Sequence, residues 1–209
     1  MPSVKYYKYL NSDGWTPQGY GQYDLPADGK PGKWHSVKGA LVPCGNGLHV
    51  MRPQDLLEWY GEQLWQIEVK GPVIESGTKC VVRKMRLVRQ VMSDRKWRLF
   101  ACDCAARALS FSGGEIDQRS IDAIRVARAY ARGQATEKQL AAAWEAASDA
   151  ALDAASDAAM DAARAAAWAA AWDAASDAAW DAERQWQIAR IAKYLDGEPR
   201  AYPLPKATK

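Results

Sequence analysis

The chain has 209 residues but only two Phe, two His and four Cys. Four cysteines are too few for the dense pattern of a secreted disulfide scaffold, so we expect reduced thiols in a cytoplasmic protein. No stretch of about 18 residues is free of charges, which excludes a predicted membrane span. Residues 1–11 mix polar and aromatic side chains and lack the apolar segment of a signal peptide.

Glycine and proline are absent between Thr136 and Asp196. What the chain has instead is ten Trp, together with alanine at 24 of the 42 positions from 141 to 182. Aromatic and aliphatic side chains at this level exclude a disordered chain for most of the length. Alanine is the strongest helix former, so the stretch predicts one long helix or a helical hairpin.

The formal net charge of +3 hides a strong asymmetry along the chain. Residues 1–100 carry a net charge of +6, whereas residues 141–182 carry a net charge of −7. Such a distribution indicates either an internal electrostatic match or a charged partner for one half.

Residues 1–92 predict a small β-rich α+β domain. The sequence indicates strands at Val4–Leu10, Trp34–Val42, Leu64–Val69 and Lys79–Val91, because β-branched and aromatic residues dominate there between turn-forming segments. A short helix is expected after Arg52, where Pro53 suits a first helical turn.

Residues 93–197 predict an all-α region, followed by a proline-containing tail at 198–209. A first helix is expected after Ser93-Asp94, and a second from about Asp117 to Arg132. The residues expected to form the buried stripe of the first helix are Trp97, Phe100, Ala101, Cys104, Ala105 and Leu109. Thr136 and Gln139 match a capping box for a third helix.

A four-residue repeat over 141–184 has an acid followed by two alanines in most units, and the position before the acid is often a bulky residue. Because an α-helix has 3.6 residues per turn, the bulky positions advance around the helix and form no single seam. An isolated straight helix would leave tryptophan on every side. The predicted contact residues for a protein partner, or for a homo-oligomer, are Trp144, Trp168, Trp172 and Trp180.

A candidate polar site lies in the first domain at His35, Cys44 and His49. Together with Cys80 these are the only Cys and His side chains there, but their spacing matches no paired zinc-ligand pattern, so no metal is assigned. His49 with Cys44, Glu58 or Glu62 is an alternative catalytic pair. We assign no catalytic residue and no cofactor.

A basic ridge covers residues 79–98, with eight bases against one acid. The residues predicted to contact phosphates are Arg83, Lys84, Arg86, Arg89 and Arg95. Trp97 is the only aromatic residue within the ridge, and we expect it to lie in the core.

Two stretches of the chain resemble known families. The segment from Val4 to about Val91, with Cys44-Gly45-Asn46-Gly47-Leu48-His49, resembles an uncharacterised domain of phage and prophage proteins that carries a Cys-x-x-Gly-[Phe/Leu]-His turn. Leu48 stands where Phe is more usual. Residues 95–195 are similar to bacterial and phage proteins labelled as immunity proteins, which also continue into Ala/Trp-rich helices. That resemblance rests on Arg98–Leu109 and on Tyr130-Ala131-Arg132-Gly133.

These observations predict a non-enzymatic phage or prophage accessory protein, cytoplasmic in a bacterial host cell, that acts as an inhibitor or immunity-like protein by binding a macromolecule. The expected partner is a host or phage protein, and no membrane is involved. Two alternatives remain open. One is a nucleic-acid-binding protein that uses the ridge at 79–98, and the other is a nucleotide-directed enzyme with its site near His49.

Overall fold

The computed structural model describes residues 4–59, 61–111, 116–149 and 169–207, with side chains throughout except at 169–180. Contacts divide the chain into two compact units. The sheet unit comprises residues 1–94 and 192–197, and the helical unit comprises residues 95–191 and 198–209. The predicted α+β class, with a β-rich first half and a helical second half, is confirmed.

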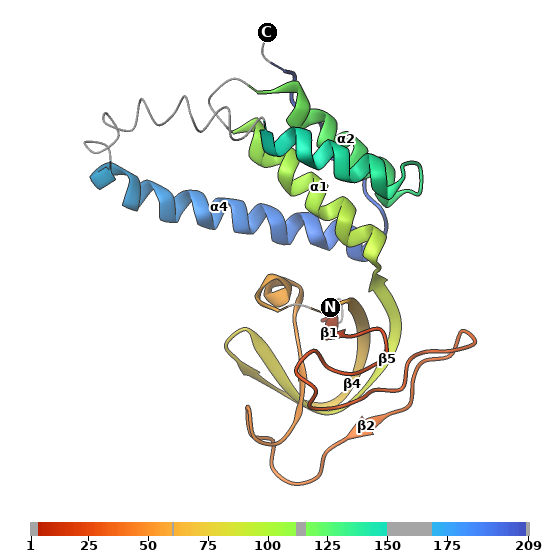
Figure 1. Ribbon diagram of the computed structural model, residues 1–209. Helices are drawn as coiled ribbons and strands as arrows, with labels where there is room; N and C mark the ends of the chain where they lie inside the picture. The colour runs from red at the N-terminus through yellow and green to blue at the C-terminus, as the bar shows by residue number, and fades with distance from the viewer. Residues whose placement is uncertain (1–3, 60, 112–115, 150–168, 208–209) are drawn as a thin grey trace. The chain divides into compact units, whose positions relative to one another are not determined.

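The sheet unit is built on one antiparallel sheet with the strand order β1-β4-β5-β2, in which β3 also pairs with β5 (Figure 1). Its strands are β1 (Tyr6–Leu10), β2 (His35–Ser36), β3 (Leu48–Val50), β4 (Gln63–Ser76) and β5 (Lys79–Met92). The turn between the two long strands contains Gly77, whose φ of 59° favours glycine.

The β4–β5 ribbon has one apolar and one polar face. Ile67 and Leu87 are paired across the ribbon and belong to the hydrophobic core. The other side, here called the outer face, carries three cross-strand pairs: Gln66–Arg89, Glu68–Arg86 and Lys70–Lys84. This alternation is typical of an antiparallel sheet that is covered on one side only.

The predicted strand at Trp34–Val42 is confirmed only at His35–Ser36. Beyond it the chain leaves the sheet, because Gly39 has a φ of 81° and the Asn46 side-chain amide donates to the carbonyls of Lys38 and Ala40. The expected helix after Arg52 is the 3₁₀ helix η1 (Pro53–Glu58).

The helical unit contains α1 (Asp94–Ser110), α2 (Gln118–Ala131), a helix over 137–149 and most of α4 (Ala169–Asp196). The predicted capping box at the start of the third helix is confirmed: the Gln139 N–H donates to Thr136 Oγ1, and the Thr136 N–H donates to Gln139 Oε1. No helix in the described part of the chain is long and apolar enough to cross a membrane.

The buried stripe of α1 differs from the predicted one. Its buried residues are Leu99, Phe100, Cys102, Asp103 and Ala106, so the prediction is wrong at most positions. Cys102, and not Cys104, packs in the core with Ile124 of α2. The physical reason is that a charged residue faces the interior: the Asp103 side chain is only 1% exposed.

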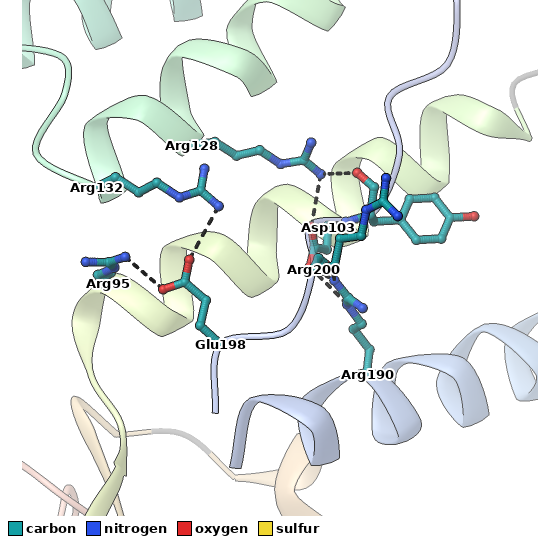
Figure 2. Close-up of polar contacts among 8 residues, drawn as sticks. Arg95, Asp103, Arg128, Arg132, Arg190, Glu198 and Arg200 are labelled. Atoms are coloured by element: carbon teal, nitrogen blue, oxygen red, sulfur yellow. Dashed lines mark hydrogen bonds and ion pairs between the residues drawn. The ribbon is translucent and has the colours of Figure 1, made fainter. Parts of the chain in front are cut away.

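Asp103 is the hub of a buried ion network, in which Arg128 from α2 and Arg190 from α4 both reach it (Figure 2). Arg128 Nη2 lies 2.9 Å from Asp103 Oδ1, and Arg190 Nη2 lies 2.5 Å from Oδ2. The two guanidinium groups also donate to the carbonyls of Tyr202 and Arg200. The network therefore ties three helices to the C-terminal segment.

The C-terminal segment belongs to the helical unit. The Tyr202 N–H donates to Asp103, and Tyr202 and Leu204 pack against the core formed by α1 and α2. Glu198 pairs with both Arg95 and Arg132 (Figure 2). Residues 198–204 are thus held by side chains from the helices.

Candidate functional site

The sheet unit contains a pocket with a volume of about 700 Å³. Its walls come from β1, β3, the loop at 44–47 and the segment at 16–23. Ligand pockets in proteins typically measure about 300–1,000 Å³, so a small organic molecule fits this volume.

One wall of the pocket is the segment Cys44–His49, and the local structure explains this sequence. Cys44 has a φ of 60°, and its N–H donates to His49 Nε2 at 3.4 Å. Gly47 passes so close to Val81 that a Cβ atom would lie 2.0 Å from its Cγ1. A side chain at position 47 would therefore displace the loop from the sheet.

Lys8 of β1 supplies a buried amine at the pocket wall. The residue is 5% exposed, and its Nζ donates to the carbonyl of His49 at 2.8 Å and lies 4.7 Å from the centre of the Tyr23 ring. Burial lowers the pKa of Lys8 to about 8. Within the described residues no carboxylate lies at ion-pair distance from this amine.

A second cation, Lys79 at the start of β5, also lines the pocket, with its Nζ 5.4 Å from the centre of the Trp59 ring. Burial, followed by the positive charges of Lys79 and Lys8, lowers the pKa of His49. The described lining contains no Asp or Glu. The pocket is therefore electropositive, with aromatic rings beside its cations.

The predicted polar site is only partly assembled. Cys44 and His49 meet at the pocket, whereas His35 does not line it. His35 packs against Tyr23 at 4.7 Å between ring centres, and its Nε2 lies 3.1 Å from Asp24 Oδ2. Cys80 is buried in the sheet core. No group of three His, Cys, Asp or Glu side chains among the described residues is placed to hold a metal ion.

Neither glutamate of the alternative catalytic pair lines the pocket. Glu62 instead accepts a hydrogen bond from the Ser12 N–H at 2.7 Å, and Glu58 ends η1. Since His49 Nε2 accepts the Cys44 N–H, the imidazole is engaged by backbone and not by the thiol in this arrangement.

The five residues of the basic ridge that were predicted to contact phosphates lie in different environments. Arg83 donates to the carbonyl of Gly39 at 2.7 Å, and Arg95 belongs to the helical unit, where it pairs with Glu198. The remaining three, Lys84, Arg86 and Arg89, lie on the outer face of the β4–β5 ribbon. Arg86 pairs with Glu68, and Arg89 donates to Gln66.

An aromatic residue from outside the ridge also joins the outer face. The ring centre of Trp34 lies 4.7 Å from Lys70 Nζ, 4.7 Å from Arg86 Cζ and 5.4 Å from Lys84 Nζ. Trp34 was not identified from the sequence because it lies outside residues 79–98, where Trp97 is the only aromatic residue. Trp97 is half-buried and packs edge-on against Phe100.

Some of the tryptophans that were predicted to contact a partner lie among the described residues. Trp144 lies on the helix at 137–149 and is 70% exposed. Trp172 and Trp180 lie on α4 in the part whose side chains are not described, and Trp168 lies outside the described residues.

Three residues of interest were not singled out by the sequence patterns: Lys8, Trp34 and Asp103. A lysine between tyrosines in a predicted strand is a weak signal of burial, and Trp34 meets its cations only across the sheet. Asp103 lies between two cysteines on a predicted helix, and this unusual position for an acid is the only feature of the sequence that marks it.

No protein-family model, curated protein or solved structure matches the chain. The resemblances to a phage domain and to immunity proteins therefore stay predictions.

Proposed function

We propose that the protein is a binding protein whose sheet unit holds a small phosphate-bearing ligand with a planar ring, of the nucleotide class. The observation that carries the proposal is the buried amine of Lys8 at the pocket wall. Burying an ammonium group without a carboxylate partner is costly, and such groups concentrate at functional sites. A bound phosphate would supply the missing negative charge.

The other lining residues support the same ligand class. Lys79 adds a second cation, which a phosphate with more than one negative charge can contact. Trp59, which is half-buried at the pocket, offers a flat apolar surface against which a planar ring can pack. Because His49 Nε2 is engaged by the Cys44 N–H, we propose binding and assign no reaction.

Isothermal titration calorimetry with ribonucleoside monophosphates, the matching nucleosides and inorganic phosphate tests the proposal. We expect the monophosphates to bind at pH 7 and the nucleosides to bind at least about tenfold more weakly, because a hydrogen bond to a charged group contributes about 1.5–3 kcal/mol. Lys8→Met should weaken nucleotide binding by a similar factor.

Lys30→Met is the matched control, since Lys30 is exposed and does not line the pocket. Equal affinity of the Lys8→Met and wild-type proteins for a monophosphate would contradict the proposed role of the amine. Absence of binding by all three classes of probe would contradict the proposed function itself.

A second candidate is binding of a host or phage protein through the helical unit, in an inhibitor or immunity-like role. Trp144 supports it, because the residue is 70% exposed and exposed tryptophans are common contact residues in protein interfaces. Pull-downs from bacterial lysate with wild-type and Trp144→Ala proteins test this role. Identical sets of captured proteins would count against it.

A further inference from the structure

We infer that the outer face of the β4–β5 ribbon is a second binding site, separate from the pocket, and that its ligand is single-stranded nucleic acid. The residues that carry the inference are Lys70 of β4, Lys84, Arg86 and Arg89 of β5, and Trp34. All of them belong to the sheet unit.

The first observation is an uncompensated positive charge. Lys70 and Lys84 are directly opposite each other in the strand register. Like charges in such a pair destabilise a sheet. Among the described residues no carboxylate lies at ion-pair distance from either amine, and the nearby Glu68 is engaged by Arg86 at 2.6 Å. A polyanion on this face would relieve the repulsion.

The second observation is the position of Trp34. Its half-buried ring lies against Lys70, Lys84 and Arg86, so the indole is held beside the cations. Single-stranded nucleic acids are bound where a positively charged surface follows the backbone and an aromatic ring stacks on a base. Neither feature alone is specific, but here one surface combines them.

The third observation is the extent of the surface. From Lys84 to Arg89, β5 extends about 17 Å at 3.3–3.4 Å per residue. The Arg89 side chain is exposed and hydrogen-bonded to the neutral Gln66, so its charge is not neutralised. The cations therefore form a row along β5. Such a row suits a chain of phosphates better than a single anion.

The proposed surface leaves out two residues of the predicted basic ridge. Arg83 donates to backbone carbonyls, and Arg95 pairs with Glu198 in the helical unit, so neither is assigned to this surface. Lys70, which lies outside the ridge at 79–98, replaces them because strand pairing places it opposite Lys84.

Fluorescence anisotropy of a labelled 12-nucleotide oligothymidylate, measured from 50 to 300 mM salt, tests the inference on the full chain. Binding should weaken with salt, and Lys84→Gln should reduce the slope of log K against log salt by about 0.7, as expected for one lost phosphate contact on a single strand. Trp34→Leu should weaken binding about tenfold through the lost stacking while leaving the slope unchanged.

Two variants serve as controls. Lys30→Gln removes an exposed lysine elsewhere in the sheet unit, and Lys8→Met alters the pocket; both should keep the wild-type slope. A loss of oligonucleotide binding on Lys84→Gln but not on Lys8→Met separates this site from the proposed pocket function. The unfolding midpoint of each variant, measured in urea, verifies that the fold is retained.

Three results would overturn the inference. The first is no salt-dependent binding by the wild-type protein. The second is equal slopes for the wild-type and Lys84→Gln proteins. The third is binding of a 12-base-pair duplex as tight as that of the single strand with no effect of Trp34→Leu, because the ligand would then be recognised by charge alone.

Discussion

Asp103 of the helical unit and Lys8 of the sheet unit are both buried, but their charges are neutralised differently. In the helical unit, Asp103 is surrounded by Arg128, Arg190 and a backbone N–H, so its charge is satisfied from within. In the sheet unit, Lys8 has a carbonyl and an aromatic ring as neighbours but no acid within the described residues. A charge that is fully satisfied internally holds helices together, whereas one left without a counter-charge at a pocket is available to a ligand.

Among the substitutions considered, replacing Asp103 should lower the stability of the protein the most. Asp103→Asn leaves two buried guanidinium groups without a counter-charge, so we expect the free energy of unfolding to fall by about 3–5 kcal/mol. Urea unfolding followed by circular dichroism measures it. Glu137→Gln, an exposed acid of the same unit, should change the value by no more than about 0.5 kcal/mol. A loss below about 1 kcal/mol for Asp103→Asn would show that the network is not structural.

The pH dependence of stability tests whether Lys8 is buried as a cation in the sheet unit. Lys8 loses its proton near pH 8 in the folded protein and near its ordinary value of 10.5 in the unfolded chain. Between these values the unfolded chain binds more protons, so the contribution of Lys8 to stability rises with pH. Relative to Lys8→Met, the wild-type protein should gain on the order of 2 kcal/mol between pH 7 and pH 10.

The comparison between wild-type and Lys8→Met proteins cancels the effects of other groups that titrate in this range, including Tyr9 and Tyr23, whose pKa values are raised by burial. Urea unfolding of both proteins at the two pH values gives the difference. If the unfolding free energies of the two proteins differ by the same amount at pH 7 and at pH 10, Lys8 is not buried as a cation.

Within the helical unit, Glu198 also contacts two arginines, but its side chain is more exposed than that of Asp103. Solvent screens such a pair, so Glu198→Gln should lower the free energy of unfolding by less than about 1 kcal/mol. The same urea experiment measures this loss. A cost equal to that of Asp103→Asn would contradict the idea that burial, rather than the number of partners, determines the effect.

The smallest effect on stability is expected at the outer face. Lys84→Gln removes a contact with Trp34 and also removes the repulsion from Lys70, and these changes are similar in size and opposite in sign. We therefore expect the free energy of unfolding to change by less than about 0.5 kcal/mol. A loss above about 1 kcal/mol would assign Lys84 a structural role.

Local sequence patterns predicted where the long strands and the described helices lie, although β4 continues to Ser76, beyond the predicted end at Val69. The alternation around Leu64–Val69, the capping box at Thr136 and the β-branched run after Lys79 each depend on neighbours in the chain, and the structure confirms all three. The buried stripe of α1 was predicted wrongly, because apolar periodicity assigns no inner position to an aspartate.

The candidate site was predictable only in part. Cys44 and His49 were singled out as a pair, and they meet at the pocket because the turn between them is short and closed. Lys8 and Lys79 join them only through strand pairing, since β1 and β5 are separated by more than sixty residues. No local pattern indicates that a lysine is buried, because burial depends on segments that are distant in the chain.

The sequence by itself determined the α+β class, the order of the long strands and of the first helices, and the separation of a basic half from an acidic helical half, since these depend on composition and on local periodicity. Only the tertiary structure decided which charges are neutralised. It surrounds Asp103 with arginines from two other helices, and it places Lys8 beside a pocket and Trp34 against three cations. The physical reason is that electrostatic and stacking interactions act over a few ångströms in space, whatever the distance along the chain.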